Sequence, residues 1–274
     1  MVRPAHLMLV PPLHDQGPGR LAPVEVRRGS GAVAAPAGVE LDAVRQLLDR
    51  GLFATEYQAI VHARTGRTAA FEALARFSHP DGRPLPPGPV FAALHDDAGL
   101  FLRAELTLKL HQVEHAPRAP LFVNLDPDCW GRAGDGRINP FLALFSSSSN
   151  RVVVEVTEAL ASADAVQAHD MIAALRGRRL HVALDDVGAA NGLLSFEAIT
   201  EAEVLKFDRT LLPRMRHPRA RALVQALVRM ARETGARSVM EGVETTAEFV
   251  IARDLGFDFV QGFLFRDRAR LARR

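Results

Sequence analysis

The sequence contains a single cysteine, Cys129, among its 274 residues. One thiol excludes an internal disulfide framework and any zinc site that needs several cysteines, and it is typical of a reducing compartment such as the cytoplasm. Long apolar runs are missing as well, because no stretch approaches the ~20 apolar residues of a membrane span. Prolines and His6 interrupt the first residues before the apolar core of a signal peptide develops. We therefore expect a cytoplasmic protein with no membrane insertion.

Lysine is almost absent. Of the 34 lysine and arginine residues, only Lys109 and Lys206 are lysines, and the formal net charge is +2. The arginines are scattered along the chain and form no basic run, so the composition does not indicate a DNA or RNA polymer as a partner. An ammonium group is a compact point charge, whereas a guanidinium group is a planar fork. A position that is lysine in this arginine-rich chain therefore needs a specific reason.

The composition changes near residue 38. Residues 1–38 are rich in proline, glycine and alanine without a sustained period, which predicts a flexible N-terminal extension. Residues 39–274 predict one domain, which opens with a helical pattern, VELDAVRQLLDR, that stops at Gly51. Two strand-like runs follow at 56–63 and 68–77, joined by a turn over 64–67.

Strands and helices alternate after this predicted hairpin. Six short apolar runs end on polar groups: LFVNLD, RVVVEVTE, HVALDD, EVLKFD, RSVMEG and FDFVQG. Helical patterns, such as those over 162–177 and 219–235, lie between them. Eight strands, six of them alternating with helices, predict an α/β fold of the TIM-like (β/α)8 barrel type, with an opening strand that is paired unusually.

Polar residues follow the strands at the end where such barrels carry their active sites. They are Glu72, Asn124, Glu155, Asp185, Asp186, Lys206, Glu241 and Gln261. Five carboxylates cannot all stay ionised in a partly dry cavity unless cations neutralise them. Oxygen ligands with one amide favour Mg²⁺ or Mn²⁺ over zinc. The Asp185-Asp186 pair could place one carboxylate between two ions, as two-metal phosphoester hydrolysis requires.

Taken singly, most of these residues have an ordinary structural explanation. A lone carboxylate at a strand end is usually a helix cap or a solvated loop residue, and Asn124 alone could be a turn former. Lys206 differs, because it lies within the apolar strand VLKF, where an unpaired cation is costly. A functional role is therefore favoured for Lys206. The ten histidines lack the spacing of a metal site, and Cys129 has no visible catalytic partner.

In this order, the motifs resemble the EAL-domain cyclic di-GMP phosphodiesterases of bacteria. The tripeptide Glu-Ala-Leu occurs twice, at 72–74 and 158–160, and its context separates the two. The first lies in YQAIVHARTGRTAAFEALARFSHPDG, which is similar to the family's first two strands, and the second lies in EVTEAL, which is similar to a later E-x-T-E segment. The match continues through FVNL, ALDDVG, LKFDR, EGVET and FVQGFLF, across residues 52–266. The resemblance implies a barrel with an antiparallel first strand that hydrolyses one phosphodiester of cyclic di-GMP to give linear pGpG.

The resemblance also implies two Mg²⁺ or Mn²⁺ ions and their ligands. One ion would be held by Glu72, Asn124, Glu155 and Asp185. Asp185 would bridge to the second ion, which Asp186 and Glu241 would also hold.

Further roles are implied for residues around these ions. Lys206 would position the attacking water, and Glu244 matches the second acid of the family's E-G-V-E motif beside Glu241. Arg76 would reach a substrate phosphate, a role that a guanidinium fork suits. The remaining implied roles are nucleotide binding by Asp208, pocket lining by Gln261 and support of the loop after Asp186 by Glu158.

The loop after the two aspartates departs from the family. Where the family usually continues Phe-Gly-Thr-Gly-Tyr-Ser-Ser-Leu, this chain reads VGAANGLL and keeps clearly only Gly188 and the final leucine. Losing hydroxyls around a metal site typically costs about 10- to 100-fold in affinity or activity, and the glycines are expected to loosen the backbone. Two functions therefore stay open, a phosphodiesterase or a cyclic di-GMP receptor or protein-interaction module with little or no turnover. The family's dimer interface includes this loop, so a homodimer also stays open.

Overall fold

The computed structural model of the chain describes residues 39–134, 138–157, 162–189 and 195–274. The predicted N-terminal extension, residues 1–38, lies outside the described residues, so its flexibility and the domain boundary remain predictions. None of the helices in the described ranges combines the length and the apolar character needed to cross a membrane.

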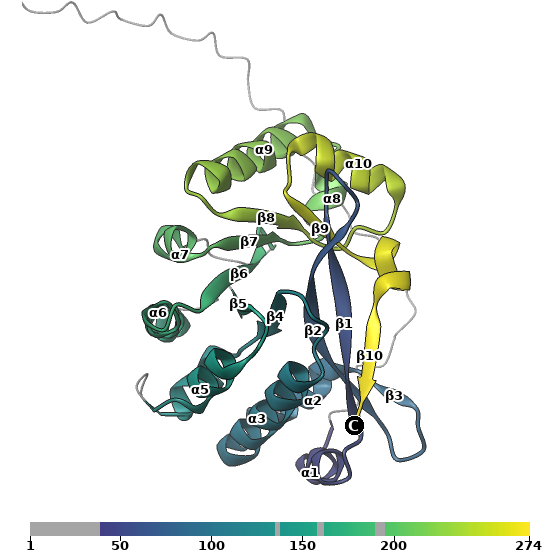
Figure 1. Ribbon diagram of the computed structural model, residues 1–274, viewed down its shortest axis with the longest axis vertical. Helices are drawn as coiled ribbons and strands as arrows, with labels where there is room; N and C mark the ends of the chain where they lie inside the picture. Colours follow the sequence, from purple (N-terminus) through teal and green to yellow (C-terminus); the bar gives the residue numbers. More distant parts are fainter. Residues whose placement is uncertain (1–38, 135–137, 158–161, 190–194) are drawn as a thin grey trace, which may run out of the picture. The chain divides into compact units, whose positions relative to one another are not determined.

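Eight strands close into a barrel (Figure 1). They are β1 (Phe53–His62), β2 (Thr68–Ser78), β4 (Leu121–Asn124), β5 (Val152–Thr157), β6 (His181–Val187), β7 (Val204–Phe207), β8 (Arg237–Met240) and β9 (Phe259–Gln261). Neighbouring strands from β2 through β4 to β9 are parallel, whereas β1 is antiparallel to both β2 and β9. The predicted TIM-like barrel with an antiparallel first strand is confirmed.

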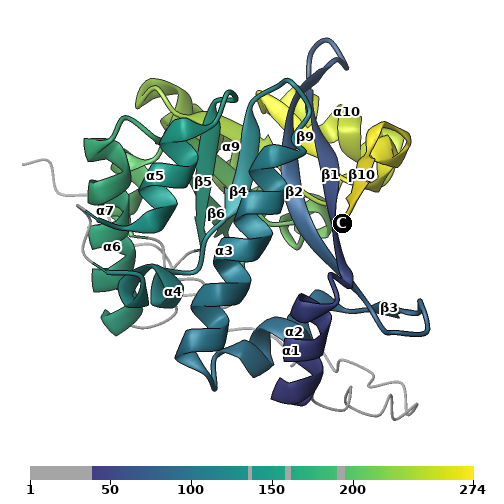
Figure 2. The same ribbon diagram turned by 60° about the horizontal axis from the view of Figure 1, so that its bottom comes forward.

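Helices cover the outside of this barrel. Figures 1 and 2 agree that α3, α5 and α6 lie outside β4, β5 and β6, and that α9 and α10 lie near β8 and β9. The helices are α1 (Leu41–Asp49), α2 (Pro87–Leu94), α3 (Ala98–Glu114), α4 (Pro127–Arg132), α5 (Pro140–Ser147), α6 (Ser162–Gly177), α7 (Phe196–Glu201), α8 (Leu211–Arg214), α9 (Pro218–Glu233) and α10 (Thr246–Leu255). The boundaries of α10 follow local rules: Thr245 and Glu248 form a capping box, and Gly256 ends the helix in the left-handed conformation.

Three short elements were not expected from the sequence. The 3₁₀ helix η1 (Phe263–Arg268) leads to β10 (Arg270–Arg273), which pairs antiparallel with the first half of β1. At the other side, β3 (Pro84–Leu85) pairs with the end of β2. The two strands, Pro-Leu and Arg-Leu-Ala-Arg, contain no apolar run like those of the barrel strands, so the sequence pattern could not mark them.

The interior of the barrel is built from alternate residues of every strand. An apolar cluster fills the end where the parallel strands begin; it consists of Ile60, Ala70, Phe122, Val153, Ala183, Val204, Val239 and Phe259. Side chains of a strand point to the same face at every second residue. Two residues further along each parallel strand, and two residues earlier on antiparallel β1, the same face carries a polar layer: Gln58, Glu72, Asn124, Glu155, Asp185, Lys206, Glu241 and Gln261. Barrel geometry therefore gathers these eight side chains above a dry apolar plug.

The turn after β9 requires a glycine. Gly262 has φ 155° and ψ −178°, a backbone conformation that is essentially restricted to glycine. A Cβ atom there would lie 2.2 Å from the carbonyl oxygen of Val243 and 2.3 Å from its nitrogen. Val243 in turn donates its N–H to the carbonyl of Gln261 at 2.9 Å. This contact holds the loop after β8 against the end of β9, beside the polar layer.

We predict that Gly262→Ala lowers the free energy of unfolding by about 3 kcal/mol, because backbone strain and a clash with backbone atoms add. Gly82→Ala is the matched control, since Gly82 also has a positive φ, +85°, but nothing lies within 4 Å of its added Cβ. The control should lose only about 1–2 kcal/mol. Urea denaturation of both variants measures the difference, and equal losses would contradict the close approach at Gly262.

Candidate active site

The polar layer centres on the ammonium group of Lys206. This side chain is 1% exposed and lies within ion-pair distance of four carboxylates. Its Nζ atom is 2.5 Å from Glu155 Oε1, 2.8 Å from Glu241 Oε1, 3.2 Å from Asp185 Oδ1 and 3.3 Å from Glu72 Oε2. We call these four carboxylates the carboxylate cage. The cage accounts for a lysine inside an apolar strand, because a buried cation is tolerated when it is paired.

One ammonium cannot neutralise four carboxylates, so burial and the excess negative charge act together on Glu155 and Glu241. Burial, with the charge of Glu72 added, raises the pKa of Glu155 well above its ordinary value. Burial likewise raises the pKa of Glu241 to about 8, despite the opposing effect of Lys206. For Lys206 itself burial opposes the charged form, but the surrounding carboxylates prevail and raise its pKa well above the ordinary value.

Glu72 is buried but accepts hydrogen bonds from two amide side chains. Its Oε1 accepts from Asn124 Nδ2 at 3.1 Å, and its Oε2 accepts from Gln261 Nε2 at 2.5 Å. Burial alone would raise the pKa of Glu72, but Lys206 and these hydrogen bonds together lower it. Glu72 therefore stays ionised while Glu155 and Glu241 hold protons more readily.

The oxygens of the cage fit a hard divalent cation. Both side-chain oxygens of Glu155, Oδ1 of Asp185 and Oε1 of the neighbouring Gln261 are buried and accept no hydrogen bond within the described ranges of the chain. The 2.5 Å approach of Lys206 to Glu155 is an ion pair without hydrogen-bond geometry, so Glu155 contacts a positive charge but accepts no hydrogen bond from the described residues. In addition, Asp185, Asp186 and Glu241 each offer an oxygen within 4.8 Å of the others. Carboxylate and amide oxygens of this kind are typical ligands of Mg²⁺ and Mn²⁺.

Asp186 has an unusual backbone that turns it toward the same opening. Its φ is +57°, a value that is uncommon outside glycine, and the pairing of β6 with β7 shifts register between Leu184 and Val187. Such irregularities re-aim side chains at the ends of strands and cost energy. Burial and the neighbouring charge of Asp185 raise the pKa of Asp186. Two adjacent residues that would ordinarily face opposite sides of a strand therefore both contribute carboxylates to one group.

A cavity of about 330 Å³, here called the acid cavity, opens above the cage. Besides Glu72, Asp185, Asp186 and Glu241, its lining includes Gln58, Asp208, Arg209, Glu244 and Gln261. Asp208 also has a local structural role, because its Oδ1 accepts from the backbone N–H and the hydroxyl of Thr210. The predicted residues Asp208, Glu244 and Gln261 are thus brought together with the candidate metal ligands.

Sequence reasoning missed Gln58. Its Oε1 accepts from Gln261 Nε2 at 2.7 Å, and it lies directly opposite Glu72 in the β1–β2 hairpin. A usable signal was present, because a turn over 64–67 places a residue near 58 across from Glu72. Without that register, a glutamine within a strand carries no mark of function.

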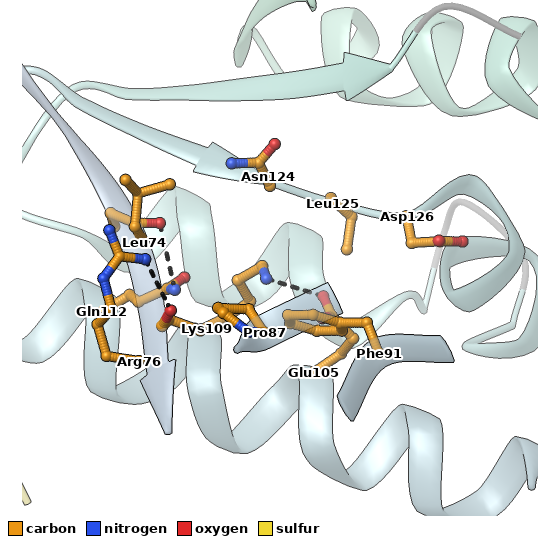
Figure 3. A pocket seen from close by; sticks show the side chains of 12 residues that line it. Leu74, Arg76, Pro87, Phe91, Glu105, Lys109, Gln112, Asn124, Leu125 and Asp126 are labelled. Carbon is orange, nitrogen blue, oxygen red and sulfur yellow. Dashed lines mark hydrogen bonds and ion pairs between the residues drawn. The ribbon is translucent and has the colours of Figure 1, made fainter. Parts of the chain in front are cut away.

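Arg76 lines a different cavity from the one above the cage, and its predicted contact with a substrate phosphate stays a prediction. It lines a second cavity, of about 360 Å³, together with Asn124 and Leu74; we call this the side cavity (Figure 3). Its Nε donates to Glu56 Oε2 at 2.8 Å, and its Nη1 donates to the carbonyl of Ala75 at 3.0 Å. Leu74 also lines the acid cavity, so the two cavities share a wall at this residue. Arg76 therefore faces a space next to the carboxylate cage and is already engaged by a carboxylate.

The second lysine of the chain lies in the side cavity. Lys109 Nζ is 2.8 Å from Glu105 Oε2, one turn earlier on α3, and both side chains are only 3% exposed. Figure 3 shows this pair across the cavity from Asn124, Leu125 and Asp126. Both lysines of this arginine-rich chain are therefore buried in ion pairs.

The loop after Asp186 is described only in part. Gly188 has φ +85°, and an added Cβ would lie 2.9 Å from Leu211 Cδ1. Gly188 thus adopts a turn conformation that favours glycine and lies beside Leu211 of α8, while the looser backbone expected of this loop stays a prediction. Ala190 to Leu194 and the second tripeptide at Glu158 lie outside the described residues, so the roles predicted for them remain predictions.

Comparisons with a family model and with curated proteins agree on one protein family. The sequence model of the EAL domain matches residues 41–267. The cyclic di-GMP phosphodiesterase RocR of Pseudomonas aeruginosa is 31% identical over 241 residues, which cover 82% of this chain and 59% of RocR. The match covers 33%, 27% and 32% of the lengths of three other curated relatives and 59% of RocR. The chain therefore spans less than two thirds of each of these four relatives.

Solved structures agree with this match. The MucR phosphodiesterase of Pseudomonas aeruginosa, determined as a c-di-GMP complex, superposes with a TM-score of 0.71 at 27% identity, covering 85% of this chain and 97% of that structure. BlrP1 of Klebsiella pneumoniae, determined with manganese and cyclic di-GMP, gives a TM-score of 0.61 at 26% identity, covering 81% of this chain and 56% of BlrP1.

The two lysines provide a matched test of the cage. We predict that Lys206→Met and Lys109→Met each lower the free energy of unfolding by about 3–5 kcal/mol, because each leaves buried carboxylate without its partner. Mn²⁺ should restore a large part of the loss in Lys206→Met, since a divalent cation can replace the ammonium among four carboxylates. It should restore little in Lys109→Met, where a single carboxylate remains. Denaturation with and without Mn²⁺ measures this, and equal recovery in both variants would refute a cage-specific cation site.

Proposed function

The chain belongs to the EAL domain family, and from that premise we propose that it is a metal-dependent phosphodiesterase that hydrolyses cyclic di-GMP to linear pGpG. The observation that carries the proposal is the carboxylate cage around Lys206, with its orphaned buried oxygens beside the Asp185-Asp186 pair. RocR bears the name of a cyclic di-GMP phosphodiesterase, and the MucR and BlrP1 structures hold this dinucleotide. These relatives support cyclic di-GMP as the substrate, and the carboxylate cage supports metal-dependent hydrolysis as the reaction.

The proposed ligand sets follow the polar layer. Glu72, Asn124, Glu155 and Asp185 would hold one Mg²⁺ or Mn²⁺ ion, and Asp185, Asp186 and Glu241 would hold a second. When bound, two such metal ions activate water and stabilise the leaving oxygen of a phosphodiester. The pKa values of Glu155, Glu241 and Asp186 are raised, so protons compete with the metal ions for the carboxylate oxygens of these three residues. Metal affinity is therefore expected to increase with pH through the range near 8.

Other residues of the site bind and orient. Lys206 contacts both Asp185 and Glu241, so its ammonium fixes their carboxylates and offers N–H donors to a water between them. Glu244, Asp208 and Gln261 line the acid cavity, where they can accept or donate hydrogen bonds to the nucleotide. Arg76 would meet a phosphate from the side cavity, with the N–H groups that Glu56 and Ala75 leave uncommitted.

The altered loop after Asp186 sets our expectation for the rate. It lacks the hydroxyls of the usual family sequence, so we propose slow turnover with a demand for high metal concentration. A protein that binds cyclic di-GMP without hydrolysing it would be a receptor, and the loop is the feature that favours this second function. We further propose a cytoplasmic location, in line with the single cysteine, and a homodimer as a state to be tested by sedimentation.

The activity is tested by incubating purified protein with cyclic di-GMP and Mg²⁺ or Mn²⁺ and separating the products by chromatography. We expect pGpG from the wild-type chain and a loss of more than about 100-fold in Asp185→Asn, because removal of a shared ligand should exceed the cost of an outer partner. Asp81→Asn is the control, since Asp81 is exposed, pairs with Arg83 and lies outside the lining of the acid cavity. Near-normal hydrolysis by Asp185→Asn would remove the two-metal assignment, and binding without any pGpG would select the receptor.

A second prediction concerns the half-buried pair of Glu56 and Arg76. Glu56→Gln keeps a hydrogen-bond acceptor for Arg76 but removes a negative charge from the approach of an anionic substrate. We expect KM to fall by about 2- to 5-fold with kcat unchanged, since a pair that water reaches is worth at most about 1 kcal/mol. Steady-state kinetics beside Glu114→Gln, a charge change at the end of α3, measure the effect. An unchanged KM in Glu56→Gln would mean that Arg76 does not meet a substrate phosphate.

A further inference from the structure

A third cavity lies at the opposite end of the barrel from the carboxylate cage. It has a volume of about 500 Å³ and is bounded by His62 at the end of β1, the β1–β2 turn, the starts of β8 and β9 and the ends of α9 and α10. His62 pairs with Phe259, the first residue of β9, which places this cavity beneath the apolar plug. Its charged lining is Arg64, Arg232, Arg237, Arg253, Asp254 and Asp258. We call it the arginine cavity.

The two aspartates of the arginine cavity are already committed. Asp258 accepts from Arg237 Nη1 at 3.0 Å through Oδ1, and from the N–H and hydroxyl of Ser238 at 3.0 and 3.1 Å through Oδ2. Asp254 Oδ1 accepts two hydrogen bonds from its neighbour Arg253 at 3.2 Å each. Four guanidinium groups against two carboxylates leave a formal charge of +2, with most N–H groups unused.

Local structure explains only part of this clustering. Arg232 and Arg253 lie in the last turns of α9 and α10, where cations favour the helix dipole, and Arg232 Nη2 also donates to the carbonyl of Gly256 at 2.8 Å. Arg237 begins β8 and has Asp258 as its partner. Arg64 lies in the hairpin turn, away from any helix end, and forms no hydrogen bond or ion pair with another described residue. Arginines from four separate segments thus line one cavity, and helix ends and ion pairs account for three of them but not for Arg64.

We propose that the arginine cavity binds a small polyphosphate anion, of the class of pyrophosphate or the polyphosphate group of a nucleotide. Guanidinium forks match the oxygens of phosphate groups and bind them in pairs. The volume lies within the ~300–1,000 Å³ that small-ligand sites usually have. The site is distinct from the acid cavity, whose lining is predominantly anionic and repels such a ligand when no divalent cation is present. It does not depend on the proposed phosphodiesterase activity.

The test is calorimetric titration with pyrophosphate in EDTA at constant ionic strength, so that no metal can draw the anion to the carboxylate cage. We expect saturable binding that weakens at least tenfold in Arg64→Gln and in Arg253→Gln. Arg83→Gln, at an arginine that is 74% exposed and outside the cavity, should bind like the wild-type chain. A parallel titration with ATP distinguishes the sources: tighter binding than pyrophosphate indicates a nucleotide, and equal binding indicates the polyphosphate alone.

Hydrogen exchange provides a second measurement that does not rely on the variants folding identically. Pyrophosphate should slow exchange in residues 62–67 and 256–258 of the wild-type chain. Non-saturable binding, equal affinity in Arg64→Gln and Arg83→Gln, protection confined to the acid cavity, or displacement of pyrophosphate by cyclic di-GMP would each overturn the proposal.

Discussion

The structure depends on one buried interaction, the ammonium of Lys206 among four carboxylates. Carboxylates at this density repel one another strongly in a low-dielectric interior, and the ammonium offsets only part of that repulsion. Burial, with this remaining repulsion added, raises the pKa values of Glu155 and Glu241, and several of these carboxylate oxygens accept no hydrogen bond from the described part of the chain. Replacing a buried group of this kind with apolar side chains is often neutral or stabilising. The cage is therefore poorly explained by stability alone, and this supports the proposal that it binds metal ions.

The barrel explains how such a group is assembled. Alternation along eight strands puts an apolar side chain at one level and a polar one two residues away, so eight polar side chains meet above a plug that excludes water. The irregular backbone at Asp186 adds a ninth, because its left-handed conformation turns a second aspartate into the group. The two ends of the barrel then differ in charge: carboxylates gather where the parallel strands end, and guanidinium groups gather where they begin.

Much of this arrangement could be predicted from the sequence, because it follows from period and order. Apolar runs that end on polar residues marked the strands, and the barrel rule brought Glu72, Glu155, Asp185 and Lys206 together. What could not be predicted depended on register or on side-chain contacts. Gln58 was missed because its role comes from its place opposite Glu72. Arg76 carried no sign that Glu56 would engage it and that it would face the side cavity.

The most direct test of the central claim is the position of Mn²⁺ in a crystal of the protein, located by its anomalous scattering. The account predicts two sites that share Asp185, one toward Glu72 and Glu155 and the other toward Asp186 and Glu241, with Lys206 withdrawn from some of its four carboxylates. No anomalous site at the cage, with Lys206 still in contact with all four carboxylates at saturating Mn²⁺, would contradict it.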